Sequence, residues 1–198
     1  MLSSIHPLGE RTRHNPWLVT VGAFAVGAIG AGALIGAALG WLGSLAMPDS
    51  SANANLVVIG AIALTAGLFD VVNVPVPGPR RQVNEHWIGA YRGWVYGGAF
   101  GVQLGAGLMT FVVTWGVYAT LLIELVSASP LVGGVIGAVF GAGRSVALFL
   151  AGRVDRASRL SSFHSRMAAL GPPVRLVAGY GAVIVGLLSV AGVMLWPV

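Results

Sequence analysis

The sequence predicts an all-α fold, a polytopic transmembrane bundle of about five spanning helices that forms a single domain over residues 1–198. Hydrophobic residues make up 56% of the chain and charged residues only 9%. Because an average soluble domain has roughly 25% charged residues, this chain lacks the surface of a soluble globule. Its hydrophobicity also excludes a disordered chain. The apolar stretches show none of the alternation that is typical of transmembrane barrel strands.

Five apolar stretches are long enough to cross a bilayer, which takes roughly 20 apolar residues. Pro75, Pro77 and Pro79 end the second stretch, and Gly171-Pro172-Pro173 are expected to break the helix before the fifth. The first stretch exceeds the roughly 7–15 residues of a signal-peptide core, so we expect it to be retained as a span. The predicted spans cover about 17–47, 55–75, 94–126, 131–152 and 174–196.

Arginine placement predicts the orientation of these spans. All eleven basic residues are arginines. Ten of them lie before the first span, between the second and third spans, or between the fourth span and the start of the fifth, which five spans would place on one side of the membrane. Since arginine and lysine favour the cytoplasmic side, we expect a cytoplasmic N-terminus and an external C-terminus in the plasma membrane of a bacterium. The ten are Arg11, Arg13, Arg80, Arg81, Arg92, Arg153, Arg156, Arg159, Arg166 and Arg175.

Glycines recur at every fourth residue in three spans, which places them on one face of each helix. Such faces let helix backbones approach closely, as in a glycine zipper. They could pack within the chain, against a second copy in a homo-oligomer, or against other membrane subunits. The ladders are Gly32, Gly36 and Gly40; Gly97, Gly101 and Gly105; and Gly133, Gly137 and Gly141.

Short matches between spans suggest an internal repeat. The first and third spans share Gly-Ala-Phe followed by Gly-Ala-Gly, and the second and fourth share Ile-Gly-Ala followed by Ala-Gly. The matches run in the same direction, so a duplication would be a parallel repeat of two plus two helices. Chance similarity between glycine- and alanine-rich helices is the alternative.

Two cytoplasmic segments, 76–93 and 153–173, are predicted to lie at the membrane interface. In the second, apolar residues recur at helical spacing, which favours an amphipathic helix on the inner leaflet. Its arginines would then contact lipid headgroups, although a solvated loop is the alternative. With the positive charge explained by topology, we expect the lipid bilayer as a partner and no nucleic acid. The lipid-facing basic residues of this prediction are Arg156, Arg159 and Arg166.

Motifs for catalysis are nearly absent. The chain has no cysteine, which removes disulfides and thiol chemistry. None of its histidines is paired at helical spacing, whereas a metal site needs several converging ligands. We therefore expect no catalytic residues, no metal, no cofactor and no enzymatic activity. The histidines are His6, His14, His86 and His164.

Three polar side chains inside the spans form the candidate binding site: Asp70, Gln103 and Arg144. All three are predicted at similar depth in the inner half of the bilayer. Charges at such depth usually pair or line a wet cavity, so Asp70 is expected to pair with Arg144, with Gln103 nearby. The alternative is that the two charged side chains reach the inner surface separately. Glu124, near the outer end of the third span, is expected at the interface.

One part of the chain resembles a known family. Residues 80–85 read Arg-Arg-Gln-Val-Asn-Glu, 91–97 read Tyr-Arg-Gly-Trp-Val-Tyr-Gly, and 100–105 read Phe-Gly-Val-Gln-Leu-Gly. Over about residues 80–150 the chain resembles the cytochrome c biogenesis CcdA/DsbD-like membrane proteins. The resemblance implies a glycine-rich helical bundle that moves reducing equivalents or a small solute across the membrane. The cysteine pair of that family is missing here, so no catalytic residue carries over.

Taken together, these observations favour a small transporter or transmembrane transfer scaffold that uses the polar cluster in the inner half of the bilayer. The alternative is a non-catalytic membrane subunit or assembly factor of a larger complex, whose glycine faces contact partner helices.

Overall fold

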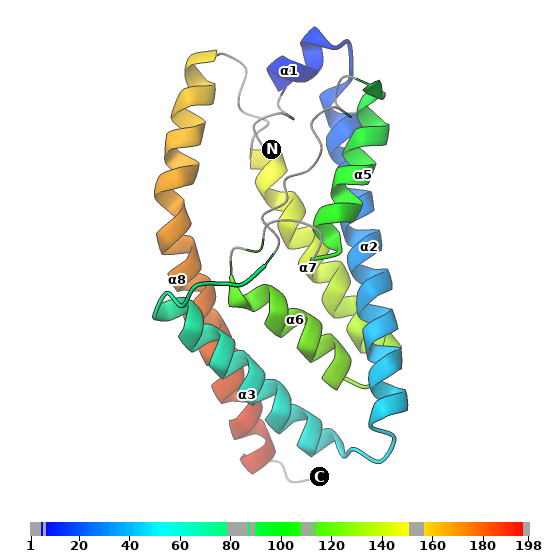
Figure 1. The fold of residues 1–198 in the computed structure, drawn as a ribbon, viewed down its shortest axis with the longest axis vertical. Coiled ribbons are helices and arrows are strands. Elements are labelled where there is room, and N and C mark those ends of the chain that lie inside the picture. The colour runs from blue at the N-terminus through cyan, green and yellow to red at the C-terminus, as the bar shows by residue number, and fades with distance from the viewer. Residues whose placement is uncertain are drawn as a thin grey trace. The chain divides into compact units, whose positions relative to one another are not determined.

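Helices are the regular elements throughout the part of the chain that the structure describes. The structure is a computed structural model and describes residues 5, 7–78, 87, 90–107, 112, 114–150 and 157–195. No strand occurs among these residues, which confirms the all-α prediction. The helices are α1 (Pro7–Thr12), α2 (Trp17–Ala46), α3 (Ala52–Val71), α5 (Gly93–Gly105), α6 (Trp115–Val126), α7 (Pro130–Leu150) and α8 (Ala157–Leu195) (Figure 1).

Three helices of the described residues are long and apolar enough to cross a membrane, so the prediction of five is wrong in number. They are α2, α3 and the segment Ala169–Leu195 of α8. Many of their large apolar side chains are exposed, among them Leu34 and Leu188. Such continuous exposed apolar surface is unusual for a soluble monomer and fits a bilayer environment.

The third apolar stretch was predicted as one span and is instead divided into two short helices. Helix α5 has 13 residues and α6 has 12, or about 20 Å and 18 Å of helix, against a hydrocarbon core of about 30 Å. Past the end of α5, Gly107 has a φ of 77°, which glycine adopts without steric penalty. Before α6, Thr114 is extended. The chain therefore leaves the helical path at Gly107, and Thr114 is still outside the helix that follows it.

The predicted break before the fifth span is also absent. Helix α8 continues through Pro172 and Pro173, so the segment expected to form a separate amphipathic helix is continuous with the apolar one. A proline removes one backbone hydrogen bond, but helices in membranes tolerate this loss when neighbouring groups compensate.

The chain divides into two compact units. Unit 1 contains Met1–Ala33, Pro79–Phe111 and Ala138–Leu170, and unit 2 contains Leu34–Gly78, Val112–Gly137 and Gly171–Val198.

The core of unit 1 is formed where α5 packs on the first half of α2. Phe24, Ala28, Tyr96 and Phe100 are almost completely buried there. A methyl group added at Gly101 would overlap the carbonyl oxygen of Phe24. The two helix backbones are thus in contact, and the small residues permit this approach.

In unit 2, α3 packs against α6 and against the second half of α8. Gly67 of α3 lies close to the backbone of Gly179 of α8. Elsewhere in the unit, Gly36 of α2 and Gly133 of α7 lie backbone to backbone.

The first and third predicted spans, which share one set of the repeat matches, differ in structure. The first span forms the continuous helix α2, whereas the third is split into α5 and α6.

Candidate functional site

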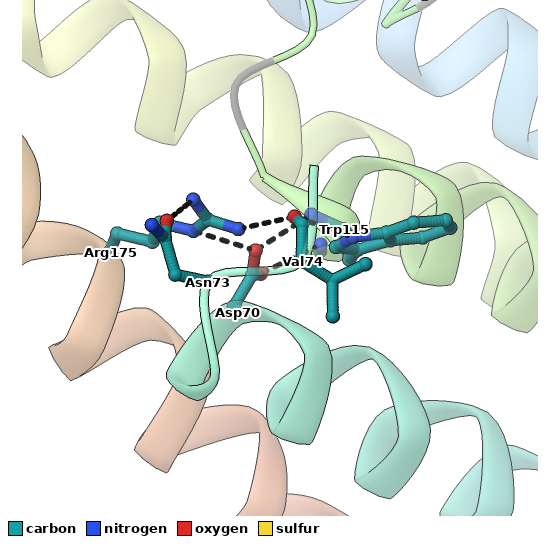
Figure 2. A network of polar contacts seen from close by, with 6 residues as sticks. Asp70, Asn73, Val74, Trp115 and Arg175 are labelled. Carbon is teal, nitrogen blue, oxygen red and sulfur yellow. Dashed lines mark hydrogen bonds and ion pairs between the residues drawn. The ribbon is translucent and has the colours of Figure 1, made fainter. Parts of the chain in front are cut away.

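The most elaborate polar cluster of the described residues lies at the end of α3 in unit 2 and is centred on Asp70. Asp70 is in the last turn of α3 and is only 3% exposed. Its carboxylate accepts hydrogen bonds from the backbone N–H groups of Trp115 at 3.0 Å and Gly116 at 3.2 Å (Figure 2). These are the first two residues of α6, so Asp70 caps that helix from a neighbouring one. A carboxylate at this position satisfies free N–H groups and complements the helix dipole.

Arg175 of α8 is the cationic partner of this carboxylate. Its Nε atom lies 3.3 Å from Asp70 Oδ1, and its Nη2 donates to the carbonyl of Val74 at 2.8 Å. Its Nη1 also donates to the side chain of Asn73. Figure 2 shows the guanidinium between these three acceptors. Asn73 has a φ of 61°, and after this turn the side-chain oxygen of Asn73 and the backbone carbonyl of Val74 both accept from the arginine.

Aromatic side chains close the other side of the cluster. The indole Nε1 of Trp115 donates to the carbonyl of Val74 at 3.2 Å, and its ring meets Phe69 edge to face at 5.1 Å. The hydroxyl of Tyr118 donates to the carbonyl of Pro77. The carboxylate thus receives three donors, and the segment after α3 is held by α6 and α8. This arrangement joins three chain segments around one carboxylate.

The other two predicted site residues lie in unit 1. Arg144 of α7 donates from Nη1 to the carbonyl of Leu104 at 3.3 Å, and its guanidinium carbon lies 4.8 Å from the centre of the Phe140 ring. Leu104 is in the last turn of α5, where its carbonyl also accepts from the N–H of Gly107 at 3.1 Å and where a cation is favourable. Gln103 is half-buried on α5 and makes no side-chain hydrogen bond to another described residue.

The predicted pair of Asp70 and Arg144 stays a prediction, and each of the two side chains has another partner within its own unit. Asp70 pairs with Arg175, and Arg144 binds a helix carbonyl. Each charge stabilises one end of the divided third stretch: the carboxylate suits the N-terminus of α6, and the guanidinium suits the C-terminus of α5. Sequence reasoning missed this because it treated 94–126 as one helix, although its length was the signal of a break.

The predicted lipid-facing arginines fall where the structure gives no side-chain description. Arg156 lies outside the described residues. Arg159 and Arg166 belong to α8, and their side chains are outside the described part. Their contact with lipid stays a prediction.

A second buried acid, Glu10 of α1, was not foreseen. It is completely buried in unit 1 and accepts hydrogen bonds from the hydroxyl of Tyr96 and, at 2.9 Å, from that of Thr20. Arg13 lies 3.4 Å from the same carboxylate. These contacts tie α1 to α2 and α5. The sequence offered no signal for them, because the segment before α2 reads as an ordinary charged terminus.

Glu124 of α6 is only 2% exposed within unit 2, and its place at the membrane interface stays a prediction. No group of three or more histidine, cysteine, aspartate or glutamate side chains that could hold a metal occurs among the described residues.

Comparison with known proteins gives two curated relatives, both named methylamine utilization protein MauF. The protein from Paracoccus versutus is 32% identical over 154 residues, which cover 72% of this chain and 54% of the relative. The protein from Paracoccus denitrificans is 32% identical over 156 residues, which cover 77% and 53%. The chain thus spans about half the length of these relatives.

No protein-family model matches the chain, and no solved structure matches it. The resemblance to CcdA/DsbD-like proteins is wrong, because the relatives that match over most of this chain carry the MauF name.

Proposed function

We propose that this chain is a non-catalytic membrane protein that acts as an accessory factor in methylamine utilization. The observation that supports this most directly is the 32% identity to MauF over 154 residues. The three apolar helices fit a protein that works within the bilayer. On this proposal the exposed apolar side chains of its helices, such as Leu34 and Leu188, contact other membrane subunits of the same machinery.

The polar residues favour this role over that of a transporter. In transporters with divided helices, the free helix ends bind the substrate or the coupling ion. Here Asp70 occupies the start of α6 and Arg144 occupies a carbonyl at the end of α5. The charges on which a transport site was predicted are thus used by the chain itself, which supports a scaffold.

Deletion of the gene in its source organism tests the link to methylamine. We expect the deletion strain to lose growth with methylamine as the sole nitrogen or carbon source and to grow normally on ammonium and sugar. Expression of the wild-type chain from a plasmid should restore growth. Unchanged growth on methylamine in the deletion strain, or no growth on methylamine in the parent, would contradict the proposal.

Uptake of isotope-labelled methylamine separates the accessory role from transport. We expect cells of the deletion strain to take up methylamine at the parental rate over the first minute, before metabolism contributes. We also expect the protein, purified in a mild detergent, to bring with it a stoichiometric membrane partner. Loss of uptake together with purification as a solitary oligomer would favour a transporter instead.

A further inference from the structure

Glu124 is a buried acid that takes no part in the cluster around Asp70. It lies near the end of α6 in unit 2 and is only 2% exposed. Its Oε2 atom is fully enclosed and has no hydrogen-bond partner in the described part of the chain. An unpaired polar atom in such a place is rare in folded proteins.

The carboxyl group occupies a space left by a glycine. A methyl group at Gly36 of α2 would lie 3.2 Å from Glu124 Cδ, and Gly36 in turn packs against the backbone of Gly133 of α7. The segments of α2 and α7 that belong to unit 2, Leu34–Ala46 and Pro130–Gly137, contain no acidic, basic or histidine residue. The helix segments that meet at Gly36 therefore offer the glutamate no charge.

The other titratable groups of unit 2 are engaged or exposed elsewhere. Asp70 and Arg175 bind each other at the opposite end of α6, and eight residues, or about 12 Å of helix, separate Gly116 from Glu124. The hydroxyl of Tyr118 is bonded to Pro77. Asp49 and Tyr180 are exposed. Arg175 is the single cationic residue in the sequence of unit 2, and its donors are used.

An ionised carboxylate without a cation or donors is strongly unfavourable in an apolar interior, whereas its neutral acid loses far less on leaving water. We infer that Glu124 is a proton-binding site of unit 2, buried beside Gly36 of α2, in which the side chain is held as a carboxylic acid. This inference does not depend on the role in methylamine utilization, because it rests on the surroundings of one side chain.

Infrared spectroscopy of the purified full-length protein at neutral pH tests the inference. The difference spectrum between the wild type and E124Q isolates the carboxyl group of Glu124. We expect the carbonyl band of a protonated carboxylic acid in the wild type and its loss in E124Q. A difference spectrum that shows carboxylate bands instead would overturn the inference. D49N, at an exposed acid of the same unit, serves as the control and should leave the carboxylic acid band of the wild type in place.

Chemical modification gives a second readout that does not need a folded variant. The O–H of a carboxylic acid adds across one C=N bond of dicyclohexylcarbodiimide, and acyl migration then gives a stable N-acylurea from which no atom leaves. Glu124 and Asp70 are 2% and 3% exposed, so both depend on local opening of the protein to admit the reagent. We expect this membrane-soluble reagent to modify Glu124 faster than Asp70 in the wild type, as read by peptide mass spectrometry. Modification of Asp70 in preference to Glu124 would contradict a neutral Glu124.

Discussion

At the scale of single residues, Asp70 joins three segments of unit 2 that are far apart in sequence. It ends α3, caps the first turn of α6 and pairs with Arg175 of α8. Both partners of the ion pair are largely buried, with side-chain exposures of 2% and 18%. Removal of one member of such a pair leaves the other without compensation.

We therefore expect Asp70→Asn to destabilise the folded protein by about 3–5 kcal/mol. Arg175→Gln should have an effect of similar size, and the double variant should be much less damaged than the sum of both, because the two residues interact directly. The measurement is a double-mutant cycle on unfolding free energies of the protein in mild detergent. Strict additivity would show that the pair contributes nothing.

Arg144→Gln provides the control for this cycle. Since Arg144 binds the carbonyl of Leu104 in unit 1, its effect should simply add to that of Asp70→Asn. A large coupling energy between Asp70 and Arg144 would instead support the pairing predicted from the sequence.

At the scale of elements, contact between helix backbones decides which glycines matter. Gly101 of α5 lies against the carbonyl of Phe24, whereas Gly22 of α2 has open space around it, and both belong to unit 1. The two positions therefore form a matched pair in which only the neighbouring backbone differs.

We expect Gly101→Ala to lower the unfolding free energy by about 1–3 kcal/mol, because the added methyl group forces the two backbones apart. Gly22→Ala should be neutral or stabilising by up to about 1 kcal/mol, since alanine favours helix and meets no neighbour. Thermal unfolding of the two purified variants measures the difference. Equal tolerance at both positions would show that α5 and α2 are not in backbone contact.

The elements also show how far the sequence could be interpreted. Apolar length predicted α2 and α3 well, because a continuous apolar run needs no information from other parts of the chain. The division between α5 and α6 was not predictable in this way, since it depends on Asp70 and Arg144, which are remote in sequence, stabilising the new helix ends. From the sequence, Arg175 indicates only the orientation of the spans, because its partner Asp70 lies 105 residues away.

At the scale of the whole molecule, the positions of the arginines still predict the sidedness of the membrane helices. If α2 and α3 both cross the bilayer, the loop between them lies on the side opposite to residues 1–15. With arginine at the N-terminal side and none in the loop, that loop should be external.

Single cysteines in this cysteine-free chain test the orientation. Ala52→Cys should react with an impermeant thiol reagent in intact cells. Thr12→Cys should react only after the membrane is permeabilised. Both side chains are exposed, so burial will not mask the result. The reverse pattern of labelling would invert the orientation.

The partners of Asp70 are synthesised long after Asp70 itself. The ribosome makes Asp70 45 residues before Trp115 and 105 residues before Arg175. Helix α6, with 12 residues, is too short to leave the translocon as an independent span. Until α8 has been made, Asp70 has no cation to neutralise it. A chain truncated before Arg175 therefore carries a buried acid without its cationic partner, and completion of α8 supplies that partner.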